Sequence, residues 1–164
     1  MSRSFWPPVR VLAGLLAVAA ACAACGGGPA KVSVKAAAAN PCLLLSQSQA
    51  RAIMGGGTQK PLLTSQGGCQ YTTQPDAAEL TPGEDNVNLS FNLGTSASMA
   101  VLTYVIAHPA PVPSVGHDAR CGAVKDNPTV FDLIAAVSRR DQLVVIGASC
   151  ALDARFARQA LSRL

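Results

Sequence analysis

The chain has 164 residues, with 13 lysine and arginine residues against nine aspartate and glutamate residues, for a formal net charge of +4. Removal of an N-terminal segment that contains Arg3 and Arg10 leaves eleven basic against nine acidic side chains, a net charge of +2. So small an excess favours neither nucleic-acid binding nor a strong electrostatic membrane patch, and the few aromatic residues argue against base stacking. We therefore expect no nucleic-acid partner.

The N-terminal segment has the layout of a secretory signal peptide. Arg3 and Arg10 flank its start, about a dozen apolar residues follow from Val11, and small residues then lead into Cys22 and Cys25. The apolar run is shorter than the ~20 residues of a transmembrane helix. A cysteine at this point, followed by glycines, resembles the lipobox of bacterial lipoproteins. The resemblance implies that the cysteine thiol carries diacylglycerol and becomes the first residue of the mature chain.

Two cysteines compete for the lipid. Cys22 follows three alanines, which suit a small-residue cleavage site, whereas Cys25 is followed directly by Gly26-Gly27-Gly28-Pro29. If Cys25 is acylated, Cys22 leaves with the signal peptide, and the four remaining cysteines form the even set expected in an oxidising compartment. We therefore favour Cys25, with Cys22 as the alternative. A secreted protein without lipid, cleaved near Ala21 or Ala24, is a further possibility.

These features predict three parts of the chain. Residues 1–24 form the signal peptide, residues 25–40 form a flexible tether rich in glycine and alanine, and residues 41–164 form a single domain. A diacyl anchor holds firmly because it buries two acyl chains. We expect the domain to be anchored to the cell membrane on its extracytoplasmic face.

The first part of the domain begins with a helix. Ser46 and Gln49 have the spacing of a capping box, which predicts a helix over residues 46–54 that ends at three glycines. A short strand is predicted over residues 69–73. The proline-containing acidic segment 75–85 is predicted to be a loop.

The middle of the chain is predicted to contain a strand and a helix. Apolar and polar residues alternate over residues 87–93, which is typical of a half-buried strand. Residues 96–108 place apolar side chains at helical spacing, so that His108 would lie at the helix C-terminus, where the helix dipole favours a cation. Three prolines at 109–113 predict an extended connector.

The last third is predicted to contain strands over residues 119–125, 130–137 and 143–149, the last two joined by a polar hairpin turn. Asp153 is predicted to cap a closing amphipathic helix. The expected order is α-β-β-α-β-β-β-α. Consecutive strands with short turns favour an α+β fold with a single antiparallel sheet and helices packed on it.

Four cysteines remain in the domain: Cys42, Cys69, Cys121 and Cys150. We favour the pairing Cys42–Cys69 and Cys121–Cys150, in which each disulfide closes a loop of about 30 residues and contributes ~3 kcal/mol in the chain-entropy model. The alternative is a zinc site, but the domain lacks a Cys-x-x-Cys pair and an exported compartment favours disulfides. We expect no metal and no cofactor.

His117 and Asp118 are the candidate catalytic residues if the protein is an enzyme. Histidine titrates near neutral pH, but neighbouring residues on an extended chain point to opposite faces. We favour a turn at Gly116-His117-Asp118, with Asp118 bonding local backbone amides. Nucleophile-elbow and phosphate-loop motifs do not occur in the domain. We therefore expect a protein without enzymatic activity.

Several segments together carry a family resemblance. They are Asn40-Pro41-Cys42, Gly68-Cys69-Gln70-Tyr71, Val115-Gly116-His117-Asp118-Ala119 and the C-terminal hairpin with its helix. They resemble a family of secreted actinobacterial lipoproteins built on a domain of unknown function. His117 departs from the family pattern, in which the acidic residue usually follows the glycine directly. The resemblance implies a lipoprotein at the cell envelope and gives no agreed activity or catalytic residues.

The sequence thus predicts a lipid-anchored envelope protein with a non-enzymatic binding or accessory domain. Its partner would be an unknown envelope protein or a small amphiphilic ligand. Two alternatives stay open. One is an extracytoplasmic hydrolase or metal-dependent enzyme that uses His117 and Asp118, and the other is a structural subunit of an envelope complex.

Overall fold

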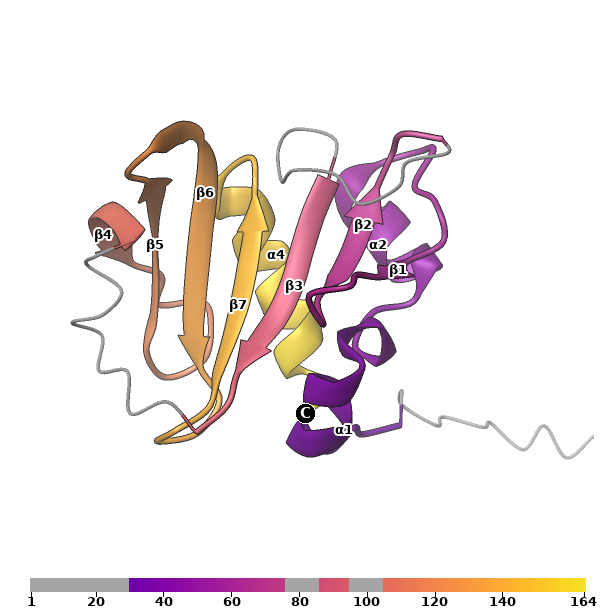
Figure 1. The fold of residues 1–164 in the computed structure, drawn as a ribbon, viewed down its shortest axis with the longest axis horizontal. Helices are drawn as coiled ribbons and strands as arrows, with labels where there is room; N and C mark the ends of the chain where they lie inside the picture. Colours follow the sequence, from indigo (N-terminus) through magenta and orange to yellow (C-terminus); the bar gives the residue numbers. More distant parts are fainter. Residues whose placement is uncertain (1–29, 76–85, 95–104) are drawn as a thin grey trace, which may run out of the picture.

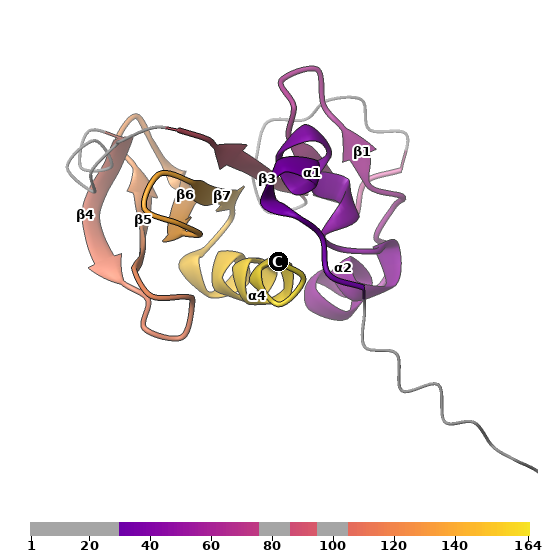
Figure 2. The ribbon, with the colours of Figure 1, turned by 90° about the horizontal axis from the view of Figure 1, so that it is seen from below.

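The computed structural model describes residues 30–75, 86–94 and 105–164. This part of the chain forms one seven-stranded antiparallel sheet with helices on one of its faces (Figures 1 and 2). The strands are β1 (Leu62–Leu63), β2 (Cys69–Thr72), β3 (Asn86–Asn92), β4 (Ile106–Pro111), β5 (Ala119–Val124), β6 (Asn127–Ala136) and β7 (Gln142–Gly147). The helices are α1 (Val34–Ala39), the 3-10 helix η1 (Pro41–Leu43), α2 (Gln47–Met54) and α4 (Cys150–Leu161). The predicted α+β class with a single antiparallel sheet is confirmed.

The strand order in the sheet is β1-β2-β3-β7-β6-β5-β4. The last strand along the chain, β7, therefore lies in the middle of the sheet, between β3 and the β4–β6 meander. Helix α4 follows β7 directly and packs back across β6 and β7, while α2 lies beside it on the same face (Figure 2). Short turns join β5 to β6 and β6 to β7 and account for the antiparallel pairing of these strands, whereas β3 pairs with β7 across a long stretch of chain.

Helix α2 and strand β3 form where the local sequence patterns predict a helix and a strand. Ser46 and Gln49 form both hydrogen bonds of the capping box, and Gly55 ends the helix with a φ of 103°. On β3, Val87 and Leu89 are fully buried, while Asn88 between them and Ser90 after them are half-buried. Both predictions are confirmed.

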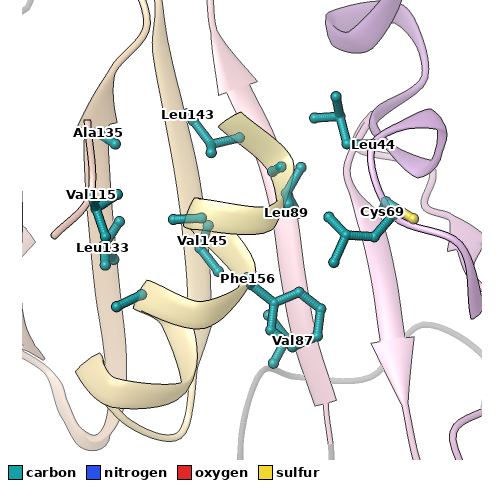
Figure 3. Packing of buried hydrophobic residues seen from close by; sticks show 14 of the residues in the cluster. Leu44, Cys69, Val87, Leu89, Val115, Leu133, Ala135, Leu143, Val145 and Phe156 are labelled. Atoms are coloured by element: carbon teal, nitrogen blue, oxygen red, sulfur yellow. The ribbon is translucent and has the colours of Figure 1, made fainter. Parts of the chain in front are cut away.

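The hydrophobic core lies between the sheet and α4. Figure 3 shows Phe156 of α4 among side chains from several strands, and its ring centroid lies 5.2 Å from that of Tyr71 on β2. Ala157 and Ala160 extend the buried stripe of α4. Tyr71 is fully buried, and its hydroxyl donates a hydrogen bond to the backbone carbonyl of Leu45 (3.4 Å). The layer between sheet and helix is therefore packed with protein side chains.

The prediction of a helix over residues 96–108 is wrong at its C-terminal end, and residues 96–104 lie outside the described residues. Residues from Ile106 form the edge strand β4, whose pairing with β5 shifts register between Ala107 and Ala110. His108 lies in this irregularity with a φ of 48°, so it does not end a helix. The predicted proline connector is also partly wrong, because Pro109 and Pro111 belong to β4. An edge strand tolerates proline since one side of its backbone makes no ladder hydrogen bonds.

Residues 30–40 do not form part of a flexible tether. Ala37 of α1 is fully buried, and the backbone N–H of Val32 donates to the carbonyl of Arg163 (2.7 Å). The Arg163 side chain in turn donates to the carbonyl of Ala30 (3.0 Å). A six-residue helix is unstable alone, but packing against the domain and the chain end stabilises it. The predicted domain start at residue 41 is therefore about ten residues too late.

The closing helix starts earlier than predicted. Its N-cap is Ser149, whose hydroxyl accepts a hydrogen bond from the N–H of Leu152 (3.3 Å). Asp153 lies one turn into α4 with a buried side chain, so its prediction as the cap is wrong. Ser149 satisfies a backbone donor at the helix start, as serine commonly does. The short strand β1 was not predicted at all.

Candidate functional site

The two predicted disulfides are present. Cys42 in η1 bonds to Cys69 in β2, with 5.1 Å between their Cα atoms, and Cys121 in β5 bonds to Cys150 in α4, with 5.7 Å. The first bond joins the N-terminal helices to the sheet, and the second joins α4 to the opposite half of the sheet. Paired sulfurs cannot act as thiolate ligands, so these four cysteines do not form the alternative zinc site. Cys22 and Cys25 lie outside the described residues.

His117 and Asp118 lie in the exposed turn that precedes β5. Gly116 adopts a φ of 58° there, and the Asp118 backbone carbonyl accepts a hydrogen bond from the N–H of Ala136 (2.9 Å). The Asp118 carboxylate lies 3.9 Å from Nε of Arg120. The candidate pair thus occupies a turn with an adjacent arginine. Within the described residues, no group of three or more histidine, cysteine, aspartate or glutamate side chains is arranged to hold a metal ion.

Two buried carboxylates were not identified from the sequence as unusual groups. Asp153 in α4 is fully buried, and neither of its oxygens has a hydrogen-bond partner among the described residues. Asp132 in β6 is 5% exposed, and its Oδ1 likewise has no hydrogen-bond partner in this part of the chain. The sequence feature that could have identified Asp132 as a buried carboxylate is its position inside the apolar run 130–135. Asp153 carried no such signal, because an acidic residue in the first turns of a helix is ordinary.

The two carboxylates belong to opposite faces of the sheet at the same end. Phe131 pairs with Gly147 in register and packs against the main core, so the next residue, Asp132, points to the other face. On that face its neighbours in β6 and β7 are Ile134 and Val144, which form a second apolar cluster with Ile106. Asp153 lies on the helix side, against Gly147.

Burial raises the pKa of both groups. Desolvation raises the pKa of Asp132 to about 6. Desolvation and, secondly, the charge of Asp132 raise the pKa of Asp153 to about 8. A buried carboxyl group with a raised pKa is more stable in its neutral form, and its ionisation destabilises the folded protein. Because both groups lie within packed layers, we interpret them as determinants of stability rather than as a catalytic pair.

The N-terminal part of the domain forms a distinct surface. We use the name basic edge for the surface around the edge strand β1 and helix α1, both of which contact η1. It consists of exposed leucines and lysines: Leu43, Leu62, Leu63, Lys31, Lys35 and Lys60. Exposed large apolar side chains next to cations are typical of an interaction surface.

Comparison of the chain with models of known protein families, with curated proteins and with solved structures finds no match. Among the helices of the described ranges, none is long and apolar enough to cross a membrane.

Proposed function

We propose that this protein is a lipid-anchored envelope lipoprotein whose domain lies on the extracytoplasmic face of the cell membrane. The observation that carries the proposal is the pairing of all four domain cysteines in two disulfides. Disulfides of this kind persist in oxidising compartments outside the cytoplasm. Their pairing leaves Cys22 and Cys25, at the end of the signal-like segment, as the only cysteines available for acylation.

The domain acts as a binding or accessory module without catalytic activity. The layer between the sheet and α4 is packed with buried side chains, which favours binding on the outer surface over binding of a ligand between sheet and helix. The described residues whose pKa is clearly shifted are two buried aspartates and a buried tyrosine, whereas His117 lies in an exposed turn. Both points support a protein partner or a membrane surface as the binding target.

Metabolic labelling with a clickable fatty acid tests the anchor. The full chain is produced in a bacterium that processes lipoproteins, as wild type, Cys25→Ser and Cys22→Ser. We expect Cys25→Ser to lose the label and to leave the membrane fraction, while the matched Cys22→Ser variant keeps both. Loss of label in Cys22→Ser alone would move the acylation site to Cys22. If both variants keep the label and the membrane association of wild type, an anchor on one of these two cysteines is contradicted. A wild type without label would contradict lipid anchoring itself.

A separate experiment tests the absence of catalysis. The wild type and His117→Ala are compared for hydrolysis of ester, amide and phosphate reporter substrates, and in vivo crosslinking is used to capture protein partners. We expect no activity that depends on His117, and crosslinks that persist in the variant. Turnover that is present in wild type and lost in His117→Ala would favour the enzyme alternative.

A further inference from the structure

We propose that the basic edge docks onto the surface of an anionic lipid bilayer, so that the domain lies on the membrane in one orientation. This inference rests on the proposed lipid anchor. The surface has three components that together fit such a bilayer: exposed leucines, exposed lysines, and a short connection to the acylated cysteine.

The leucines gather at a free edge of the sheet. Among the described strands, β1 has a neighbour on one side only, and Leu62 and Leu63 on it are 40% and 47% exposed. Leu63 pairs in register with Cys69, whose disulfide partner Cys42 immediately precedes the exposed Leu43. The disulfide therefore fixes Leu43 close to the edge strand, and apolar side chains flank this edge from two elements.

The described segment that contains these leucines, residues 30–75, carries charge of a single sign. Residues 26–75 contain four basic side chains and no acidic ones, whereas all nine acidic residues of the chain lie between positions 76 and 164. Lys35 on α1 and Lys60 before β1 are exposed. Of the acidic residues, four lie at 76–85, outside the described residues, and the others belong to β6, α4 and the turns next to β5 and β6. Lysines close to an anionic bilayer attract it, and this attraction acts within about a Debye length.

The chain enters the domain at the same end. Both views place α1, α2 and β1 at the end where the described chain starts, and β4 at the far end (Figures 1 and 2). Because residues 30–40 are folded onto the domain, only five residue steps separate Cys25 from Ala30, which span at most roughly 17 Å. Acylation at Cys25 would thus hold this end of the domain near the lipid headgroups.

A second copy of the chain is a less suitable occupant of this surface. Pairing of two β1 edges would bring like charges together, since Lys60 lies two residues from the strand in each copy. An anionic bilayer instead accepts lysines and leucines at once, with the cations at the headgroups and the apolar side chains below them. The observations therefore favour the bilayer.

Tryptophan fluorescence gives a direct test. Trp6, the only tryptophan, lies in the predicted signal peptide, so a mature chain carries none. Leu63→Trp places a reporter in the basic edge. Leu93→Trp is the matched control, because both leucines are 47% exposed and Leu93 directly follows β3, beside Gly94, whose N–H donates to Asp141. Each acylated mature protein is reconstituted into phosphatidylcholine vesicles with and without phosphatidylglycerol, and quenching by brominated acyl chains is measured.

We expect strong quenching of the Leu63→Trp reporter in vesicles with phosphatidylglycerol and weak quenching of Leu93→Trp. The double variant Lys35→Glu/Lys60→Glu, made in the Leu63→Trp protein, should lose the strong quenching. Each lysine near an anionic surface contributes roughly a fivefold factor in association, so the pair changes it about 25-fold. The control Arg139→Glu/Arg140→Glu changes the net charge equally in an exposed turn and should keep the quenching.

The outcomes separate this inference from the proposed anchor. Failure of the wild type to float with vesicles would contradict the lipid anchor itself. Flotation with equal quenching of both reporters, or with quenching unaffected by Lys35→Glu/Lys60→Glu, would overturn docking and leave the anchor standing. Weak quenching of Leu63→Trp together with a dimer in crosslinking would assign the edge to a second copy. Circular dichroism of each variant establishes that it is folded.

Discussion

The carboxylate of Asp153 lies against the Cα atom of Gly147, where β7 ends and α4 crosses over it. A Cβ atom at position 147 would overlap Oδ1 of Asp153 and would approach Cγ2 of Val87 to 3.2 Å. Close approach of the helix, rather than an unusual backbone conformation, therefore requires glycine at the end of β7.

Gly147→Ala is expected to destabilise the domain. The added methyl group must displace either the Asp153 side chain or α4, and overpacking of this kind costs about 1–3 kcal/mol. Urea unfolding at neutral pH measures the loss. Gly56→Ala is the matched control, because a Cβ atom there meets nothing within 4 Å, and we expect almost no change. If Gly147→Ala and Gly56→Ala unfold at the same urea concentration, the contact with Asp153 is not tight.

Asp153→Asn should stabilise the domain at alkaline pH. An aspartate of an unfolded chain has a pKa near 3.9, whereas burial and the charge of Asp132 raise the pKa of Asp153 to about 8 in the folded protein. Between these pH values the folded state binds more protons than the unfolded state, so the free energy of unfolding falls as pH rises from about 4 to about 8. Asparagine does not ionise, so the free energy of unfolding of the variant does not fall for this reason.

Urea unfolding across pH 4 to 9 measures the difference. We expect Asp153→Asn to match wild type at the acidic end and to exceed it above pH 8, on the order of a few kcal/mol, since one pKa unit corresponds to about 1.4 kcal/mol. The exposed Asp126→Asn serves as the control and should keep the wild-type pH dependence. A pH profile of Asp153→Asn parallel to that of wild type would contradict a buried, neutral Asp153.

Asp132→Asn should lower the pKa of Asp153. The charge of Asp132 is the second cause of the raised pKa of Asp153, and asparagine removes it while keeping the size of the side chain. NMR titration of the carboxyl carbons would then show the Asp153 midpoint at lower pH than in wild type. An unchanged midpoint would mean that the two carboxylates do not interact across the sheet.

Removal of either disulfide should cost similar stability. The bonds close loops with sequence separations of 27 and 29 residues, and the chain-entropy model gives roughly 3.5 kcal/mol for each. We compare Cys42→Ala/Cys69→Ala with Cys121→Ala/Cys150→Ala by urea unfolding. Mass spectrometry without reduction, after thiol alkylation, tests the pairing itself. Four alkylated thiols in the folded wild type would contradict both bonds.

Local sequence patterns correctly predicted the helices and strands whose spacing of apolar and polar residues matches the faces that are buried in the fold. The capping box at Ser46 and the alternation around Leu89 specify a helix and a strand whatever surrounds them, and the structure contains both. The prediction failed around Ile106, where the apolar residues have helical spacing but the chain forms a strand that pairs with β5. Sheet pairing between distant segments overrides local periodicity, and a single sequence does not reveal that pairing.

The sequence by itself determined the fold class, the two disulfides and the signal-like segment with its candidate Cys25, because these depend on periodicity, cysteine parity and short-range order. The tertiary structure decided where Asp153 lies, since only the crossing of α4 over Gly147 removes its carboxylate from water. It also decided that residues 30–40 belong to the domain. The net charge of the whole chain hides the uneven charge of residues 30–75, whose elements α1, η1, α2 and β1 come to lie at one end of the fold (Figure 1).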